Sequence, residues 1–230
     1  MSEHMALENL TVLDLTRVLA GPFCTMMLAD MGANVIKIEV PKGGDDTRSY
    51  PPFRAKNLNG ERESVYFANI NRNKKGITLN LKAPEGKEIF KELVKKADIV
   101  VENYRPGVMD KLGLGYDVLK EINPRIIYAA VSGFGCYGPY HLRPGYDILA
   151  QAMGGMMSIT GSKGGEPTRA GSALGDILGG LHVTIGILAP RRAARGGHHH
   201  RHPCRSQRPH HYRQRAAGGR ESDGQHDRCH

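Results

Sequence analysis

The sequence predicts an α/β fold in which helices flank a Rossmann-like parallel sheet. Short apolar runs alternate with stretches of helical spacing along the first 189 residues. The opening unit is a strand, a helix and a second strand within about 30 residues, the usual size of a βαβ unit. The alternation repeats downstream, and long polar segments separate the elements. This order favours a doubly wound parallel sheet.

The opening unit is defined by two apolar runs and by the turn residues between them. Residues 10–15 form a short apolar run that predicts a buried strand. Pro22 suits the first turn of the following helix, and Gly32 is placed to end it. Residues 33–39 then predict the second strand.

The later elements follow from the same signals. Residues 41–73 are rich in Gly, Pro and Asn and predict a loop. Further strands are expected at residues 76–81, 98–102 and 125–132. Helices are expected at residues 83–96, 106–112, 116–122, 146–156 and 177–188.

Composition divides the chain after Ala189. Residues 190–230 contain ten Arg against three acidic residues, and they contain no Leu, Ile, Val, Met, Phe or Lys. A segment of this kind cannot bury enough apolar surface to offset the entropy of ordering. We therefore expect residues 1–189 to be one part of a large domain and residues 190–230 to be a basic, disordered tail. The abrupt change in mid-helix suggests that the tail is translated out of frame.

The body of the chain has an ordinary, nearly neutral composition. Cys24 and Cys136 lie in apolar patterns, which is typical of free thiols in a reducing compartment. The N-terminal residues show no secretory signal, and no apolar run is long enough to span a membrane. We therefore expect a cytoplasmic location and no membrane partner.

Several common sites are excluded by the motifs. The turn at residues 16–22 has one glycine where a dinucleotide fingerprint needs three, and there is no P-loop or G-x-S-x-G elbow. His4, His141 and His182 are the histidines of the body, and they are far apart in sequence. A zinc site or a histidine-based triad is therefore not expected.

Asp176 is the most informative carboxylate of the body. Small residues flank it and an apolar helix follows. It could cap that helix through free backbone N–H groups. It could equally be a nucleophile that the same N–H groups keep ionised.

Several motifs occur in a fixed order along residues 7–189. They include Gly-Asp-Asp-Thr-Arg at 44–48, Asn-Arg-Asn-Lys-Lys at 71–75 and Arg-Pro-Gly-Tyr-Asp at 143–147, together with residues 13–22, 32–39, 98–107 and 175–176. In this order the motifs resemble family III CoA-transferases, the formyl-CoA and crotonobetainyl-CoA:carnitine CoA-transferase group. The fold implied is the large domain of that family, here truncated.

The resemblance implies a covalent reaction at Asp176. Its carboxylate would attack an acyl-CoA thioester and give a mixed anhydride, then an aspartyl-CoA thioester, from which a carboxylic acid takes the CoA. Tyr146 would lie near the reacting acyl group. CoA and acyl-CoA would be substrates, with no permanently bound cofactor and no metal.

The resemblance also implies a set of CoA-binding residues, because Lys and Arg suit a ligand with three phosphates. These residues are Val18, Ala20, Asn73, Lys74, Lys75, Leu79, Lys82, Asn103, Tyr104, Lys111 and Arg143. Arg72 and Arg105 are secondary candidates, and Tyr50 is expected to shape the pocket for the acceptor acid.

Relatives of this family continue beyond the matched part and form interlocked homodimers, so we expect this chain to be truncated and inactive alone. An acyl-CoA racemase or isomerase of the same family is one alternative, but such enzymes usually have His where this chain has Tyr146. A module that binds nucleic acid or metal through the basic tail is another. The tail offers only Tyr212 for stacking on bases, which argues against nucleic acid.

Overall fold

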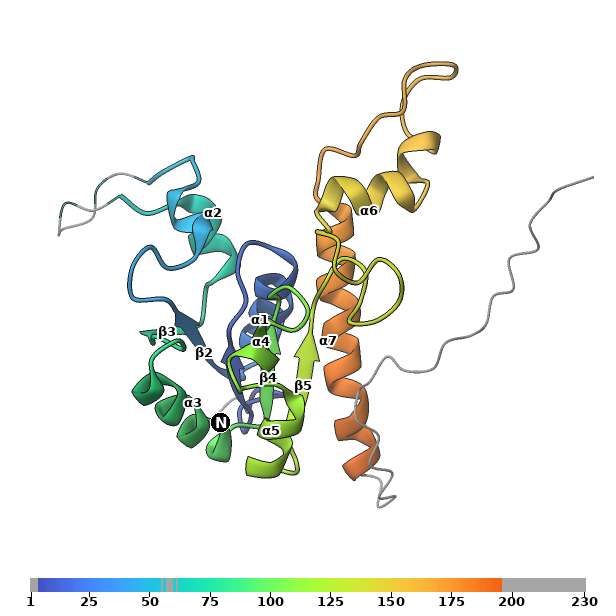
Figure 1. Cartoon of the computed structure of the whole chain (residues 1–230). Coiled ribbons are helices and arrows are strands. Elements are labelled where there is room, and N and C mark those ends of the chain that lie inside the picture. The colour runs from blue at the N-terminus through green and yellow to red at the C-terminus, as the bar shows by residue number, and fades with distance from the viewer. Residues whose placement is uncertain (1–3, 55, 57–59, 61, 196–230) are drawn as a thin grey trace, which may run out of the picture.

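Five parallel strands form the centre of the molecule, and helices cover both faces of the sheet (Figure 1). The computed structural model describes residues 4–54, 56, 60 and 62–195, with the backbone alone for 190–195. The strands are β1 (Thr11–Asp14), β2 (Asn34–Glu39), β3 (Lys75–Thr78), β4 (Ile99–Glu102) and β5 (Ile127–Ala130). Their order is β3-β2-β1-β4-β5, the order of a Rossmann sheet. The predicted fold class is confirmed.

Alternate residues of the central strands point to opposite faces of the sheet. Leu13 of β1 and Val100 of β4 contribute to one core cluster, and Val12 of β1 contributes to the other. The two strands pair in parallel with Val12 beside Ile99. This alternation creates two separate apolar layers.

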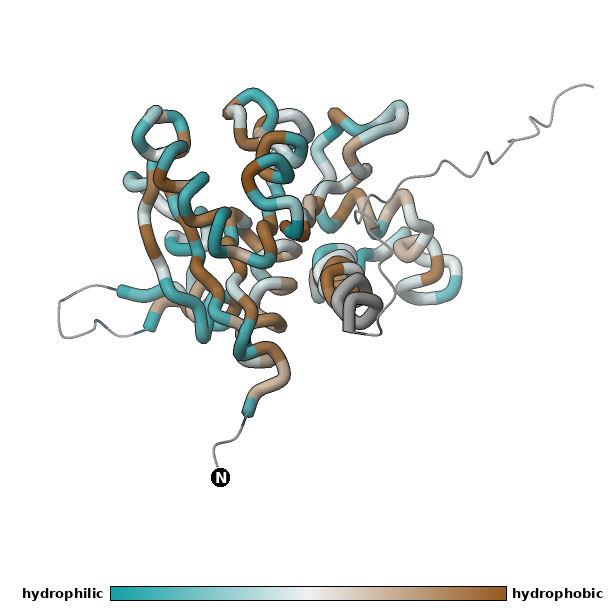
Figure 2. Tube along the Cα trace, turned by 90° about the horizontal axis from the view of Figure 1, so that it is seen from below, coloured by the Kyte–Doolittle hydropathy of each residue, from teal (hydrophilic) through white to brown (hydrophobic). Residues whose placement is uncertain are grey.

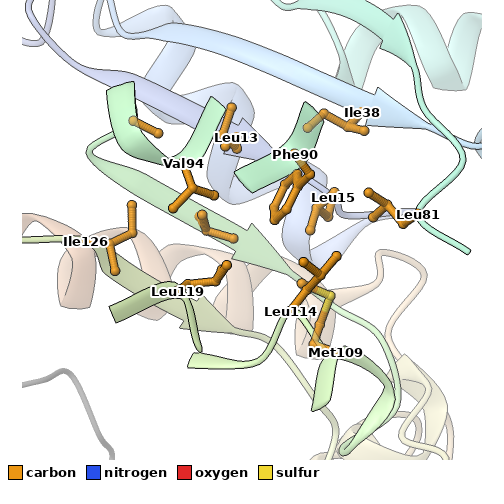
Figure 3. Close-up of a cluster of buried hydrophobic side chains, with 12 residues drawn as sticks. Leu13, Leu15, Ile38, Leu81, Phe90, Val94, Met109, Leu114, Leu119 and Ile126 are labelled. Carbon is orange, nitrogen blue, oxygen red and sulfur yellow. The ribbon is translucent and has the colours of Figure 1, made fainter. Parts of the chain in front are cut away.

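The first layer lies under α3 (Pro84–Lys96), α4 (Val108–Lys111) and α5 (Tyr116–Ile122). Figure 3 shows Phe90 and Val94 of α3 beside Leu13 and Leu119, and all four side chains are fully buried. Apolar residues at i and i+4 of one helix meet the sheet in this way.

The second layer lies under α1 (Ala20–Asp30) and α7 (Leu174–Arg195). Cys24 and Leu28 of α1 meet Ile187 of α7 there. The two helices approach closely at Gly180, where a Cβ atom would lie 2.5 Å from the carbonyl oxygen of Ala20. A glycine is therefore required at this crossing. Figure 2 shows apolar residues through the interior of the trace and mostly hydrophilic residues in its outlying loops.

The segment predicted as a loop contains two helices. They are the 3-10 helix η1 (Asp46–Ser49) and α2 (Val65–Ile70). Ser64 caps α2 by accepting a hydrogen bond from the Phe67 amide, a signal too local for a periodicity argument to detect. The third strand is also shorter than expected: it ends at Thr78, although the Leu79 amide still donates to the Glu39 carbonyl oxygen of β2.

Elements near the end of the described chain also differ from the prediction. Helix α6 (Asp147–Met153) is shorter than expected, and the 3-10 helix η2 (Met156–Ile159) follows it. Helix α7 begins at Leu174 and runs to Arg195, beyond the change in composition at Ala189. Arg and Ala are good helix formers, so the backbone continues as a helix where the apolar pattern ends. The predictions for residues 196–230 lie outside the described residues.

Candidate active site

The loops after β1 and β4 meet where the strand order reverses. The Asn103 side chain accepts a hydrogen bond from the Arg17 amide at 2.8 Å and donates one to the Arg17 carbonyl oxygen at 2.7 Å. Asn103 therefore joins the two walls of the crevice in which α/β sheets of this kind bind ligands.

Val18 has an unusual backbone conformation in this crevice. Its φ angle is 69°, a left-handed value that is rare for a β-branched residue. The Asp45 carboxylate accepts a hydrogen bond from the Val18 amide at 3.2 Å and helps to hold it there. Strain of this kind is concentrated at functional sites. Ala20 begins α1 directly after this turn.

Buried ion pairs support the turn. Lys37 donates to Asp45 Oδ2 and to the Thr16 carbonyl oxygen, both at 2.9 Å. Burial would raise the pKa of Asp45, but the Lys37 ammonium and the Thr47 donors together lower it. Arg48 forms a two-point contact with Glu39 nearby. These contacts give the residues 44–48 a structural role, and sequence reasoning missed Lys37 because a lysine within a strand gives no sign of burial.

A small hollow lies at the carboxyl ends of β1 and β2. Its lining residues are Thr16, Arg17, Ile38, Glu39, Val40, Gly44, Asp45 and Tyr104. Leu79 follows β3 at the same edge and packs with Tyr104 against the α3 face of the sheet. Lys82 lies exposed just before α3. Val18, Ala20, Leu79, Lys82, Asn103 and Tyr104 are thus all placed at the carboxyl edge.

Asp176 is the third residue of α7 rather than its cap, because Ala173 already accepts the first helical hydrogen bond, from the Ile177 amide. Gly180 lies one turn later on the same side of α7 and faces Ala20. Asp176 therefore lies one turn before the point where α7 crosses the start of α1. Burial raises the pKa of the Asp176 carboxyl, and the charge of Asp147 raises it further.

Tyr66 of α2 interacts with Asp176 through charge, and Tyr50 packs against Tyr66. Burial, followed by the charge of Asp176, raises the pKa of Tyr66 to about 12. The Tyr66 ring packs edge-on against Tyr50 with centroids 5.8 Å apart. The structure thus brings the expected Tyr50 close to the site. Sequence reasoning missed Tyr66 because it treated α2 as a loop.

Other predicted residues are placed on the surface. Tyr146 precedes α6 and is 69% exposed. Arg143 stacks on the Tyr140 ring at 4.1 Å, and its side chain is exposed. Lys111 at the end of α4 and Arg105 are exposed as well.

The prediction for residues 72–75 requires a correction. Lys74 is buried, and its three protons are donated to Asp14, to the Pro22 carbonyl oxygen and to Asn71. No donor remains for a phosphate.

The neighbours of Lys74 also have protein partners. Arg72 and Asn73 bind Asp30 at the end of α1, and Lys75 binds Asn34 at the start of β2. Both partners lie at the amino edge of the sheet, away from the hollow. These side chains therefore have structural partners at the edge opposite the hollow.

Neither a metal site nor a catalytic histidine emerges from the described part of the chain. No cluster of three or more possible metal ligands occurs among these residues. His4 pairs with Glu8, His141 with the Gly138 carbonyl oxygen, and His182 with the Leu178 carbonyl oxygen. Among the described helices none is long and apolar enough to cross a membrane.

Glu102 ends β4 beside the crevice and is buried. It accepts hydrogen bonds from the Tyr104 amide at 2.7 Å and the Tyr128 hydroxyl at 3.2 Å. Burial nevertheless raises the pKa of this carboxyl to about 7, from an ordinary value of 4.5. Its charge therefore costs folding free energy at neutral pH.

Replacing Glu102 by Gln will stabilise the chain at pH 8 but not at pH 5. Between about pH 4.5 and 7 the folded chain retains a proton that the unfolded chain has lost, so stability falls as the pH rises through this window. We expect the change in the free energy of unfolding caused by Glu102→Gln to be about 2 kcal/mol more favourable at pH 8 than at pH 5. Urea unfolding at both pH values measures this. The same difference from wild type at pH 5 and pH 8 would contradict it.

Comparison with known proteins identifies the family. Residues 7–199 match the family model for CoA-transferase family III. The human succinyl-CoA:glutarate CoA-transferase is 48% identical over 190 residues, which cover 82% of this chain and 42% of the relative. The acetyl-CoA:oxalate CoA-transferase of Acetobacter aceti is 48% identical over 196 residues, which cover 83% of this chain and 49% of the relative.

A solved structure agrees with this result. The crystal structure of a CAIB/BAIF family protein from Brucella suis has a TM-score of 0.80 at 45% identity, and the match covers 85% of this chain and 51% of that chain. The chain thus spans about half the length of this structure, and less than half that of the two curated relatives. The matched motifs, the Rossmann strand order and these similarities together show that the chain belongs to CoA-transferase family III.

Proposed function

We propose that this chain is the nucleophile-bearing part of an enzyme that moves CoA from an acyl-CoA to a carboxylic acid. The observation that carries the proposal is the position of Asp176. This half-buried carboxylate lies in the first turn of α7, one turn before Gly180 meets Ala20, and Ala20 begins α1 just after the strained turn at Val18. Named relatives act between CoA thioesters and small acids such as glutarate and oxalate.

The proposed reaction proceeds in four transfers. An Asp176 oxygen attacks the thioester carbonyl carbon, and the C–S bond breaks to release CoA thiolate. The thiolate attacks the aspartyl carbon of the resulting anhydride and frees the donor acid. The acceptor carboxylate then attacks the aspartyl thioester and again releases thiolate. This thiolate attacks the acyl carbon of the second anhydride, which regenerates Asp176 and yields the new acyl-CoA.

Burial of Asp176 supports the first transfer. A carboxylate that is partly removed from water has lost some of the hydration that weakens it as a nucleophile. Its raised pKa also means that the ionised fraction, and hence the acylation rate, rises with pH through that pKa. Tyr66 interacts with Asp176 and packs against Tyr50, and these two tyrosines are the residues that we propose to contact the acyl or acceptor group.

We propose that this chain supplies only part of the residues that form the complete active site. We therefore expect it to form a covalent adduct at Asp176 without sustained turnover. The test is to mix the chain with an acyl-CoA, trap with hydroxylamine and analyse the peptides by mass spectrometry. A hydroxamate at Asp176 supports the proposal. Labelling of other carboxyl groups alone, or no labelling, contradicts it.

A racemase remains the second candidate, and one residue argues against it. The residue just before α6 is Tyr146, where racemases of this kind usually have the histidine that acts as general base. Exchange of the α-proton of an acyl-CoA with solvent, without adduct formation, would favour the racemase.

The structure separates two lysines that the resemblance assigns to CoA. Lys82 lies at the carboxyl edge, whereas Lys75 lies at the amino edge with Asn34. Lys82→Glu will therefore weaken CoA binding by about tenfold or more, because a charge-assisted contact is replaced by repulsion. Lys75→Glu will leave the affinity unchanged. Calorimetric titration with CoA measures both, and equal effects of the two substitutions would contradict the assignment.

A further inference from the structure

Helix α6 lies across the start of α7 (Figure 1). Its apolar residues Ile148 and Met153 are largely exposed, so apolar burial does little to hold it in place. Two polar side chains connect it to the segment before Asp176 instead. They are Asp147 in its first turn and Gln151, which is only 2% exposed.

Asp147 binds the backbone immediately before Asp176. Its Oδ1 atom accepts a hydrogen bond from the Gly175 amide at 2.8 Å. The approach is tight, because a Cβ atom at Gly175 would lie 2.8 Å from the Ala150 Cβ atom. An amide in the first turn of a helix has no partner within the helix, and Asp147 supplies one.

Gln151 holds the other end of the same segment. Its Oε1 atom accepts from the Ala170 amide at 2.8 Å, and its Nε2 atom donates to the Ser172 carbonyl oxygen at 3.2 Å. Nε2 also donates to Asp147 Oδ2 at 2.7 Å and fixes the orientation of that carboxylate. Both ends of residues 170–175 are therefore fastened to α6.

We propose that Asp147 and Gln151 are positioning residues that hold the first turn of α7 so that Asp176 points at the thioester. The inference rests on the proposed role of Asp176 as the nucleophile. Asp176 is followed by Gly179 and Gly180, and glycines leave a helix start free to sample other conformations. A nucleophile must approach the carbonyl carbon along a fixed direction. The polar contacts with α6 therefore hold the first turn of α7, which its glycines would otherwise leave free to move.

Charge supports the same assignment. Asp147 adds to the effect of burial on Asp176 and raises the pKa of that carboxyl. Among the described residues, Tyr66 of α2 also interacts with Asp176. The acidic residue of α1 is Asp30, at its far end, where it is paired with Arg72. Asp147 is therefore the charged residue whose removal will most affect the titration of Asp176.

The test measures amide exchange at Gly175 and the carboxyl titration of Asp176 by NMR on the 230-residue chain. In Asp147→Ala we expect the Gly175 amide to exchange about tenfold faster, the effect of one lost hydrogen bond to a charged group. We also expect the Asp176 midpoint to fall, because a like charge is removed. Asp147→Asn will lower the midpoint in the same way while its Oδ1 atom still protects Gly175.

Two further variants separate positioning from general destabilisation. Gln151→Ala keeps the Asp147 charge, so it will speed exchange at Ala170 without lowering the Asp176 midpoint. Asp117→Asn changes an exposed acid in the first turn of α5. It will alter neither the exchange rate of the Gly175 amide nor the titration midpoint of Asp176. A wild-type Gly175 exchange rate and Asp176 midpoint in Asp147→Ala would overturn the inference. Neither reading needs a reaction, so acylation of wild-type Asp176 tests the proposed function separately.

Discussion

Asp176→Ala will abolish formation of the covalent adduct with an acyl-CoA. The substitution removes the protein oxygen that attacks the thioester in the first proposed transfer, and no water-based route gives an enzyme-bound acyl group. We expect the rate of hydroxylamine-trapped adduct to fall by at least about 10³-fold, the scale of losing a covalent nucleophile. Rapid quenching followed by intact mass measurement gives this rate.

The variant must remain folded and able to bind CoA for that result to be informative. Asp176 is half-buried and lies at the start of a helix, so its loss removes a helix-dipole interaction worth about 0.5 kcal/mol. Asp117→Ala makes the same change in the first turn of α5 and is the matched control. The control should acylate at the wild-type rate. Asp176→Ala should bind CoA with unchanged affinity while forming no adduct.

A second acidic variant tests geometry. Asp176→Glu keeps the carboxylate but moves it by one methylene, and a displacement of about 1 Å can cost about 10²-fold in rate. An intermediate rate between wild type and Asp176→Ala is therefore expected. If Asp176→Ala still forms the adduct at the wild-type rate, the nucleophile is another residue and the proposed function fails at this step.

The parallel sheet could be predicted from the sequence because its signals are local and repeated. The run at residues 10–15 and its successors mark the strands, and βαβ connections are right-handed, which restricts the strand order. The boundaries of α3 and α5 followed in the same way from apolar spacing on one helical face. Short elements such as α2 were missed because six residues provide less than two turns of pattern.

The candidate site was less predictable, because the role of a lysine depends on where the backbone takes it. The sequence alone does not distinguish Lys74, Lys75 and Lys82, and the resemblance assigns all three to CoA binding. The structure separates them into a buried ion pair, an amino-edge contact and an exposed charge at the carboxyl edge. Tyr66 shows the converse case, since it interacts with Asp176 only because α2 packs beside α1.

Lys74→Met will destabilise the chain by about 3 kcal/mol, the lower part of the range for breaking a buried pair. The Lys74 side chain is 1% exposed and its partner Asp14 is fully buried, so the variant leaves a carboxylate without its nearest counter-charge. Thr16 and Thr25 still donate to Asp14, and the Lys37 ammonium still lowers its pKa, which limits the loss.

Urea unfolding measures the effect of this substitution, with a shifted midpoint at an unchanged slope as the expected form. Lys75→Met is the matched control. It changes the adjacent, exposed lysine and should cost no more than about 0.5 kcal/mol. CoA affinity then separates the two explanations of residue 74. If Lys74 is structural, the folded fraction of Lys74→Met will bind CoA as the wild type does. A fully stable variant that has lost CoA binding would instead place the Lys74 ammonium on a phosphate, contrary to the buried pair with Asp14.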